Sequence, residues 1–270
     1  MKLNIGISPC PNDTFIFDAL YSKTIDTTPF EFEFVFEDVE TLNNLALKGQ
    51  LDIIKLSYAN YFNVLEQYVM LRSGGALGTG VGPLLISKET LDLTQMSSYR
   101  IAIPGIHTTA NFLLSYAFPG PLQKNEVVFS SIEDVVLTNQ VDAGVIIHEN
   151  RFTYQLKGLR KMMDLGAYWE QQTHMPIPLG GIAIKRNLDH TIQTKINQLI
   201  QESIRSSRKR YPTLSEFVVS HSQEMSEDVM RQHIDLYVND YSIDLGEKGK
   251  MAVQKMADTI GNHSELPLFI

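Results

Sequence analysis

The 270-residue sequence contains a single cysteine, Cys10. An intramolecular disulfide and a zinc site built from several thiolates are therefore both excluded. The sequence also lacks a basic excess, because 31 Asp and Glu residues outnumber 23 Lys and Arg residues and give a formal net charge of −8. Nucleic-acid-binding proteins normally carry a basic face, so this balance argues against a nucleic-acid partner.

Long hydrophobic runs are absent as well. No stretch approaches the 18 or so uncharged apolar residues that a membrane-spanning helix needs. The apolar segment near the N-terminus, residues 3–7, is interrupted by Asn4 and Gly6 and is too short for the core of a signal peptide. We therefore expect a soluble, cytoplasmic protein with no membrane partner.

Motifs for metals and nucleotides are also missing. The seven histidines form no HxH or HxxxH pair, and no P-loop is present. The glycines between residues 74 and 82 do not have the spacing of a dinucleotide-binding fingerprint. We expect no metal site, and we interpret Gly74–Gly80 as a flexible turn between strands.

Strand and helix patterns alternate through the first 185 residues. Residues 30–36 place four phenylalanines at every second position, which is typical of a strand with one aromatic face. Helices are predicted at residues 13–21 and 41–48, with a further helix opening at Ser57. This alternation indicates an α/β architecture with largely parallel sheets. Other strands are predicted at residues 3–7, 51–56, 69–72, 82–87, 100–103, 126–129, 143–147 and 181–185.

The last third of the sequence has a different pattern. Residues 189–261 show helical segments only, near 189–210, 212–221, 226–239 and 246–260, and we expect them to pack back on the α/β part. The length favours two domains. Candidate crossings near 87–100 and 180–181 predict a discontinuous first lobe, residues 1–90 plus 183–270, and a second lobe, residues 91–182.

Three strands run directly into small hydroxyl or amide residues that open a helix. These junctions are Ser8–Thr14, Ser57–Asn60 and Pro104–Asn111. In open α/β sheets ligands bind beyond the carboxyl ends of the strands, where helix N–H groups are available. A small-molecule carboxylate is the ligand that suits such junctions. The alternative is that Ser57 and Thr108 or Thr109 serve only as N-caps of their helices.

His148 follows the predicted strand 143–147 at the same kind of edge. An imidazole titrates near neutral pH and is suited to abstract a proton, although a lone histidine can also be structural. Asp13 and Asp18 could form a carboxylate pair, but their spacing also fits a helix cap and a surface charge. Cys10 precedes a predicted helix, and we interpret it as the wall of a pocket.

Two long strings carry a family resemblance. Residues 8–15, SPCPNDTF, and residues 148–154, HENRFTY, together with the steps Lys55–Tyr58 and Pro104–Ala110, resemble the 1,4-dihydroxy-6-naphthoate synthases. This is an enzyme family of the futalosine route to menaquinone. The resemblance covers essentially the whole chain, from the first strand to the C-terminal PLFI.

The resemblance implies a type II periplasmic-binding-protein-like fold without export. That fold has two α/β lobes, a double crossover and here a helical C-terminal segment. The implied activity is a lyase reaction that converts cyclic dehypoxanthine futalosine to 1,4-dihydroxy-6-naphthoate, with no metal and no organic cofactor. The oligomeric state is left open.

The resemblance also implies roles for particular residues. The general base of the family falls on His148. The substrate-contacting segments of the family fall on residues 55–57 and 109–110. Further substrate-binding candidates come from the first junction, at residues 8–14, and from Thr108. These binding residues are Lys55, Leu56, Ser57, Thr109 and Ala110 for the family segments, and Ser8, Asn12, Asp13 and Thr108 for the further candidates, with Asn43 also within consideration.

Two other functions remain open. The chorismate dehydratases of the same pathway share the fold, but we would not expect them to carry either long string. A non-catalytic protein that binds a small carboxylate would normally carry a signal peptide or a DNA-binding module. The sequence shows neither of these, which favours an enzyme.

Overall fold

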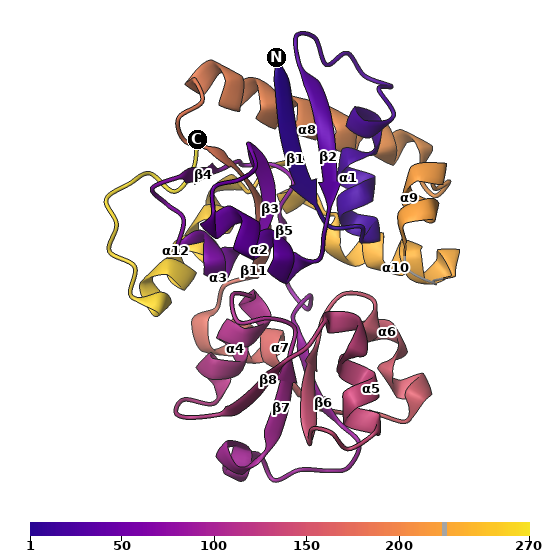
Figure 1. The fold of residues 1–270 in the computed structure, drawn as a ribbon, viewed down its shortest axis with the longest axis vertical. Helices are drawn as coiled ribbons and strands as arrows, with labels where there is room; N and C mark the ends of the chain where they lie inside the picture. Colours follow the sequence, from indigo (N-terminus) through magenta and orange to yellow (C-terminus); the bar gives the residue numbers. More distant parts are fainter. Residues whose placement is uncertain (223–225) are drawn as a thin grey trace. The chain divides into compact units, whose positions relative to one another are not determined.

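The computed structural model describes residues 1–222 and 226–270. It divides into two compact units, one formed by Met1–Gly78 and Pro178–Ile270, the other by Thr79–Ile177. The chain thus passes to the second unit once and returns once. In Figure 1 the indigo N-terminal part and the orange-to-yellow C-terminal part share the first unit. The sequence-based boundaries, at residues 90 and 182, lie later in the chain.

The first unit is built on a mixed six-stranded sheet. Its strand order is β2-β1-β3-β11-β4, and β5 also pairs with β11. The pairs β1–β2 and β1–β3 are parallel, whereas β11 runs antiparallel to β3 and β4. The strands span Lys2–Ile7 (β1), Glu31–Phe36 (β2), Ile53–Ser57 (β3), Tyr68–Met70 (β4), Ala76–Gly78 (β5) and Ile177–Lys185 (β11).

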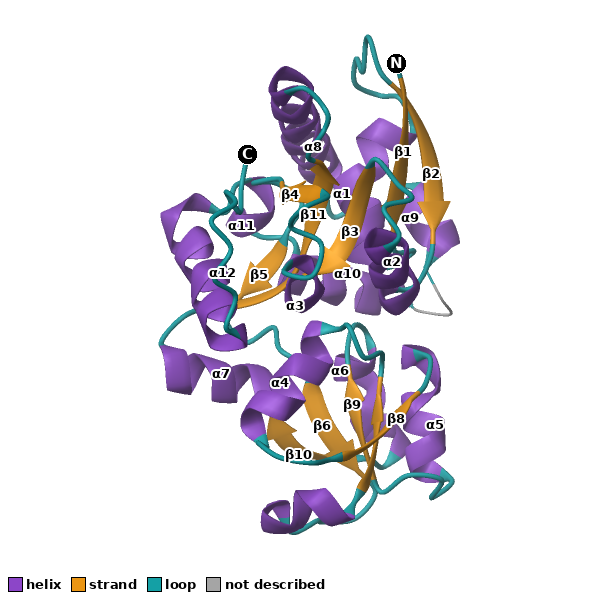
Figure 2. Cartoon of the chain, turned by 60° about the vertical axis from the view of Figure 1, so that its left-hand side comes forward, coloured by secondary structure: helices purple, strands orange, loops and turns teal. Residues whose placement is uncertain are grey.

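Local sequence explains where the first helices begin. Helix α1, Pro11–Tyr21, has proline at its first position, where the missing N–H costs nothing. Helix α2, Val39–Leu47, is capped by the Asp38 carboxylate, which accepts hydrogen bonds from the N–H groups of Glu40 and Thr41. Helix α3, Tyr58–Tyr61, follows β3 without a break. Helices α2 and α3 both contact β3, and Figure 2 shows them near its carboxyl end.

The C-terminal helices complete the first unit, as the sequence predicted. The main core contains apolar residues of α1, β1, α8 and α10, together with residues 182 and 184 of β11. Helices α8, α9 and α10 all contact α1. These C-terminal helices span His190–Arg210 (α8), Glu216–His221 (α9), Glu227–Tyr237 (α10), Asp240–Ile243 (α11) and Gly246–Ile260 (α12).

Asp18 on α1 belongs to this packing and is not the surface charge that the sequence suggested. Its side chain is only 4% exposed, and it pairs with Arg210 at the end of α8. The Ser215 hydroxyl donates a further hydrogen bond to the Asp18 carboxylate at 2.9 Å. The buried carboxylate therefore holds α1 against the C-terminal helices.

The second unit is built on a mixed five-stranded sheet with the order β10-β6-β9-β7-β8. The pairs β7–β8 and β7–β9 are parallel, whereas β6 is antiparallel to β9 and β10. The strands span Leu84–Ser87 (β6), Arg100–Ile103 (β7), Gln123–Glu126 (β8), Ala143–Ile146 (β9) and Arg160–Asp164 (β10). Its helices are Thr109–Ala117 (α4), Ile132–Leu137 (α5), Asn150–Thr153 (α6) and Leu165–Thr173 (α7), with 3-10 turns at Leu93–Ser98, Phe129–Ser131 and Tyr154–Lys157.

Backbone packing in this unit depends on two glycines. A Cβ atom on Gly82 would lie 2.2 Å from the Gly166 Cα, and one on Gly166 would lie 2.5 Å from the Gly82 Cα. Side-chain adjustment cannot relieve such contacts, because both atoms belong to the backbone. The start of α7 therefore lies directly against the chain that leads into β6.

The structure differs from the sequence predictions at several elements. Ala76–Gly78 forms β5 inside the segment expected to be a flexible turn, and β10 was not predicted. Strand β10 contains both charged and apolar residues and is largely exposed or half-buried, so it has no clear strand pattern. The strand expected at 126–129 ends at Glu126. The sheets are mixed and not largely parallel, because β6 and β11 run against their neighbours.

Candidate functional site

The first group of candidate residues lies at one sheet edge of the first unit. Strands β1 and β3 are parallel neighbours, with Ile5 opposite Ile53 and Gly6 opposite Ile54. The segments that follow parallel strands emerge at the same edge of a sheet. Ser8–Asp13 and Lys55–Ser57 are therefore brought together.

Asp13 is the centre of a buried hydrogen-bond network at this edge. Its carboxylate accepts a hydrogen bond from the Lys55 ammonium at 2.7 Å and one from the Ser8 hydroxyl at 2.7 Å. The Ser8 N–H and the Asn12 side-chain amide donate two more, at 3.3 and 2.8 Å. All four residues are buried. The charge of Lys55 is consequently directed at Asp13.

Ser57 is held by a different partner. The Asn43 side-chain amide donates to the Ser57 hydroxyl at 3.1 Å, and the Ser57 N–H donates to the Asn43 side-chain oxygen at 2.9 Å. Ser57 occupies the N-cap position of α3, but its side chain makes no capping hydrogen bond. Ser57 is thus the N-cap residue by position, but its side chain is engaged with Asn43 and does not cap the helix. Between Lys55 and Ser57, the Leu56 side chain is fully buried.

The second group of candidates lies at one sheet edge of the second unit. Strands β7 and β9 are parallel neighbours, with Ile101 opposite Ala143. Both the 104–110 segment and His148 follow these strands. Thr108 is the N-cap of α4: its hydroxyl accepts a hydrogen bond from the Asn111 N–H at 3.2 Å and donates one to the Gly105 carbonyl at 2.8 Å. The N-cap reading is correct here, and Thr109 and Ala110 form the first turn of α4.

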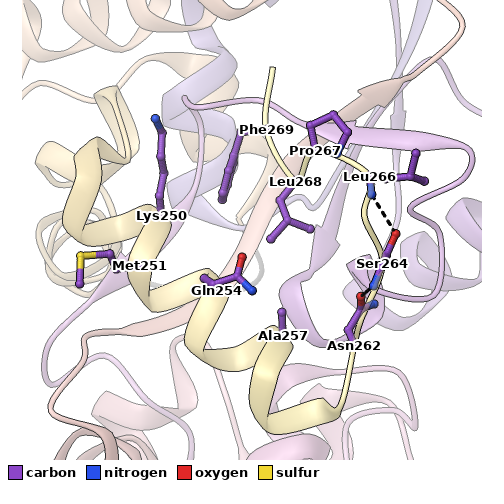
Figure 3. Close-up of a pocket in the computed structure, with 10 residues that line it drawn as sticks. All are labelled: Lys250, Met251, Gln254, Ala257, Asn262, Ser264, Leu266, Pro267, Leu268 and Phe269. Atoms are coloured by element: carbon purple, nitrogen blue, oxygen red, sulfur yellow. Dashed lines mark hydrogen bonds between the residues drawn. The ribbon is translucent and has the colours of Figure 1, made fainter.

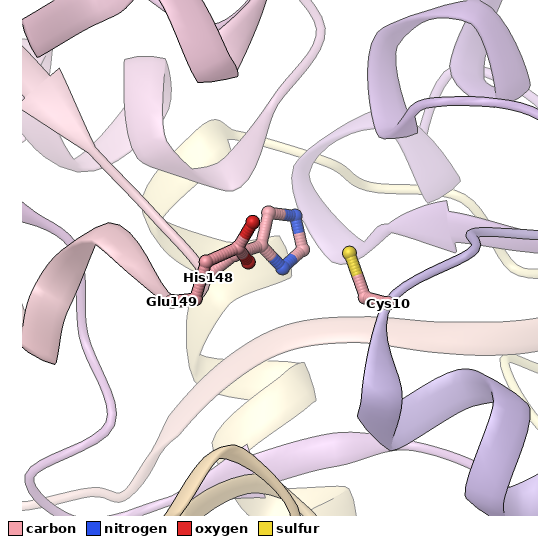
Figure 4. A group of neighbouring side chains, drawn as sticks. All are labelled: Cys10, His148 and Glu149. Atoms are coloured by element: carbon pink, nitrogen blue, oxygen red, sulfur yellow. The ribbon is translucent and has the colours of Figure 1, made fainter. Parts of the chain in front are cut away.

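His148 lies just beyond β9 in an unusual backbone conformation. Its φ angle is +55°, in the left-handed region that residues other than glycine rarely adopt. Such conformations cost free energy and cluster at active sites, although they also occur in turns and at helix ends. The ring contacts Phe129 in an edge-on arrangement, with ring centroids 5.1 Å apart. Figure 4 shows His148 and Glu149 side by side at the end of this strand.

Glu149, the residue after His148, is a largely buried acid that was not among the predicted site residues. Burial raises the pKa of its carboxyl group, and the neighbouring charge of Glu133 raises it further. Glu133 is itself buried and accepts a hydrogen bond from the Lys157 ammonium at 2.7 Å. The histidine is therefore followed by a carboxyl group in a low-polarity environment. Only the adjacency of the two residues in the HENRFTY string could have indicated this.

Arg151 fixes the segment that carries His148. Its guanidinium group donates hydrogen bonds to the Gly80 carbonyl at 2.9 Å and to the Gly82 carbonyl, and it pairs with Asp164 at 2.9 Å. The side chain is largely buried, so these contacts are well protected from solvent. The arginine of the HENRFTY string therefore has a structural role.

Cys10, also drawn in Figure 4, occupies the N-cap position of α1. Its carbonyl accepts the hydrogen bond from the Thr14 N–H at 3.0 Å that begins the helix. The side chain is a buried thiol outside any disulfide of this chain, and it makes no capping hydrogen bond.

A pocket of about 380 Å³ lies elsewhere in the first unit, between α12 and the C-terminal segment. Figure 3 shows Lys250 and Gln254 on the helix facing Leu268 and Phe269 on the segment. Its lining contains none of the residues predicted from the sequence to bind substrate.

Across residues 1–222 and 226–270, no helix has the length and apolar character needed to cross a membrane.

Comparisons with known proteins give a consistent family. The family model described as "Menaquinone biosynthesis" matches residues 3–261. A 1,4-dihydroxy-6-naphthoate synthase of Thermus thermophilus is 43% identical over 273 residues, covering 99% of each chain. A protein of the same name from Streptomyces coelicolor is 39% identical, covering 93% of this chain and 90% of the relative.

Solved structures agree on the fold. A crystal structure of an Archaeoglobus fulgidus protein has a TM-score of 0.90 at 32% identity, covering 96% of this chain and 98% of its own. The alkanesulfonate-binding protein of Xanthomonas axonopodis has a TM-score of 0.69 at 14% identity, covering 99% and 96%. The fold is that of the periplasmic binding proteins, as the sequence predicted. The chain belongs to the menaquinone biosynthesis family, among relatives named as synthases.

Proposed function

We propose that this protein is a lyase that converts cyclic dehypoxanthine futalosine to 1,4-dihydroxy-6-naphthoate without a metal or an organic cofactor. The observation that carries the proposal is the 43% identity, over 99% of both chains, to a protein named for that product. The HENRFTY segment supports it, because its histidine follows β9 in a left-handed conformation and its arginine anchors the segment.

His148 acts as the general base in this proposal. A neutral imidazole accepts a proton from the sugar-derived part of the substrate, and the electron pair left behind opens the spiro ring. Release of the three-carbon fragment then allows the remaining ring to become aromatic. The left-handed backbone at His148 supports this role, since strained conformations cluster at active sites.

The carboxylate of the substrate is held at one of two places, Ser57 in the first unit or the first turn of α4 in the second unit. Ser57, fixed by Asn43, offers a hydroxyl group. Thr109 and Ala110 lie at the N-terminus of α4, and a helix N-terminus favours a negatively charged group. The Lys55 ammonium contributes less directly, because it is engaged with Asp13. That the protein acts in the cytoplasm stays a prediction from the sequence.

The proposal is tested by incubating the purified protein with cyclic dehypoxanthine futalosine and identifying products by mass. We expect the naphthoate to accumulate, at the same rate after dialysis against a chelator. Saturable binding without a product would favour a binding protein. Dehydration of chorismate in a parallel incubation would favour the sister enzyme.

A further inference from the structure

One buried polar atom at the first sheet edge has no partner. Asn12 lies in the first turn of α1 and is 4% exposed. Its side-chain amide nitrogen donates a hydrogen bond to Asp13 at 2.8 Å. Its side-chain oxygen, Oδ1, is fully buried and has no hydrogen-bond partner in the part of the chain that the structure describes.

The orientation of this amide is determined by its neighbour. Asp13 also accepts hydrogen bonds from Lys55 and from Ser8, so it acts as an acceptor toward every group around it. Only the nitrogen of the Asn12 amide can donate to an acceptor, so the nitrogen must face Asp13. The oxygen is then directed away from Asp13 and can only accept a hydrogen bond.

Buried polar atoms in folded proteins nearly always have partners, and the exceptions call for an explanation. Asn12 is placed where a ligand would supply one. It follows β1 at the carboxyl edge of the sheet, beside the Lys55–Ser57 segment of β3. Ligands of open α/β sheets bind at this edge.

We propose that Asn12 Oδ1 accepts a hydrogen bond from a hydroxyl group of the substrate, and that Ser8, Asp13 and Lys55 are positioning residues that orient its amide. This inference rests on the proposed function. An ionised carboxylate and a carbonyl group only accept hydrogen bonds, so the hydroxyl groups of the sugar-derived part are the donors the substrate offers. In this proposal Ser8, Asp13 and Lys55 act on the substrate through Asn12, whereas direct contact of these three residues with the substrate stays a prediction.

The test compares Asn12→Ala with its parent by calorimetric titration of cyclic dehypoxanthine futalosine and of analogues that each lack one hydroxyl group. His148→Asn serves as the common background so that the substrate is not consumed. We expect Asn12→Ala to weaken binding of the full substrate about tenfold. One deoxy analogue should bind the parent about tenfold more weakly, and this analogue should lose little further affinity in Asn12→Ala, because the two changes remove the same hydrogen bond.

Asn63→Ala is the matched control. Asn63 is an exposed asparagine whose amide donates to the Asn60 side-chain oxygen at 3.3 Å, and its replacement should leave all affinities unchanged. If Asn12→Ala does not fold, Asn12→Gln replaces it, because the longer side chain keeps the amide but displaces its oxygen.

The positioning role has its own readout. Asp13→Asn allows the Asn12 amide to turn, so it should weaken binding of the full substrate about as much as Asn12→Ala, and the double variant should be no weaker than either. Equal losses for every analogue in Asn12→Ala, or unchanged affinity for the full substrate, would overturn the inference. Absence of substrate binding by the parent would instead overturn the proposed function, and the inference with it.

Discussion

The Lys55 ammonium lies 2.7 Å from the Asp13 carboxylate, and the two side chains are 8% and 1% exposed. The residues are 42 positions apart in the sequence, and the parallel pairing of β1 with β3 brings their segments together. A buried ion pair of this kind contributes little net stability when intact. Loss of one partner is costly, because the other charge remains buried without compensation.

Lys55→Met should therefore lower the free energy of unfolding by about 3–5 kcal/mol. Urea denaturation followed by circular dichroism measures this change. Lys2→Met is the matched control, because Lys2 pairs with Glu33 at 2.8 Å but both side chains are more than half exposed. An exposed pair contributes less than about 1 kcal/mol. Equal losses in the two variants would show that the Asp13–Lys55 pair is not effectively buried.

His148→Asn should abolish most of the turnover and leave the fold intact. Asparagine tolerates the left-handed backbone better than most residues, so the φ angle of +55° can be retained. Loss of a general base lowers turnover by about 10²–10⁴-fold. His174→Asn is the control, because His174 has a φ angle of +57° but is exposed at the end of α7. Near-normal turnover of His148→Asn would remove the histidine from the role of base.

Glu149→Gln should raise the free energy of unfolding at pH 7. The folded-state pKa of Glu149 is raised by burial and by Glu133, so its charged form is less favourable in the folded protein than in the unfolded chain. The cost is absent below the unfolded pKa of about 4.3 and is fully present above the folded pKa. The gain from the substitution should thus shrink as the pH falls from 7 to 4.

Asp142→Asn should have the opposite effect to Glu149→Gln, and urea denaturation between pH 4 and pH 7 measures the free energy of unfolding of both variants. The Arg100 side chain lowers the pKa of Asp142, so the carboxylate stabilises the fold above its unfolded pKa and loses this contribution as the pH falls. The substitution should cost less than about 1 kcal/mol at pH 7, since the pair is partly exposed. A gain for Glu149→Gln that does not change with pH would contradict the burial of its charge.

Gly166→Ala should destabilise the second unit. The added Cβ atom would lie 2.5 Å from the Gly82 Cα, and overpacking of this kind typically costs about 1–3 kcal/mol. The fluorescence of Trp169, the single tryptophan, reports unfolding of this unit because the residue is buried in α7. Gly158→Asn is the control: its φ angle is +79° and no atom lies near its Cβ position. Comparable losses in both variants would argue against the close approach of the two glycines.

Much of the site could be predicted from the sequence because its signals are local. The apolar runs that form β1, β3, β7 and β9 end directly before Ser8, Ser57, Pro104 and His148. A strand followed by small polar residues is a pattern within ten positions, so it can be recognised without knowledge of how the strands pair in the sheet. The helices of the last third were predicted for the same reason, since their periodicity lies within each segment.

Strand pairing could not be predicted in the same way. The directions of β6 and β11 depend on how distant segments meet, and β5 and β10 are too short or too polar to show a period of two. Asp18 appeared to be a surface charge because its partner, Arg210, is 192 positions away. Local sequence carries no information about such contacts.

By itself the sequence determined the family, the α/β class and the strand ends that carry candidate residues, and it singled out His148 as the candidate base. Only the tertiary structure decided what each polar group does there. It engages Lys55 with Asp13, fixes Ser57 through Asn43 and leaves Thr108 as a helix cap. The physical reason is that a hydrogen bond depends on the positions of both partners, and sheet register sets those positions across tens of residues.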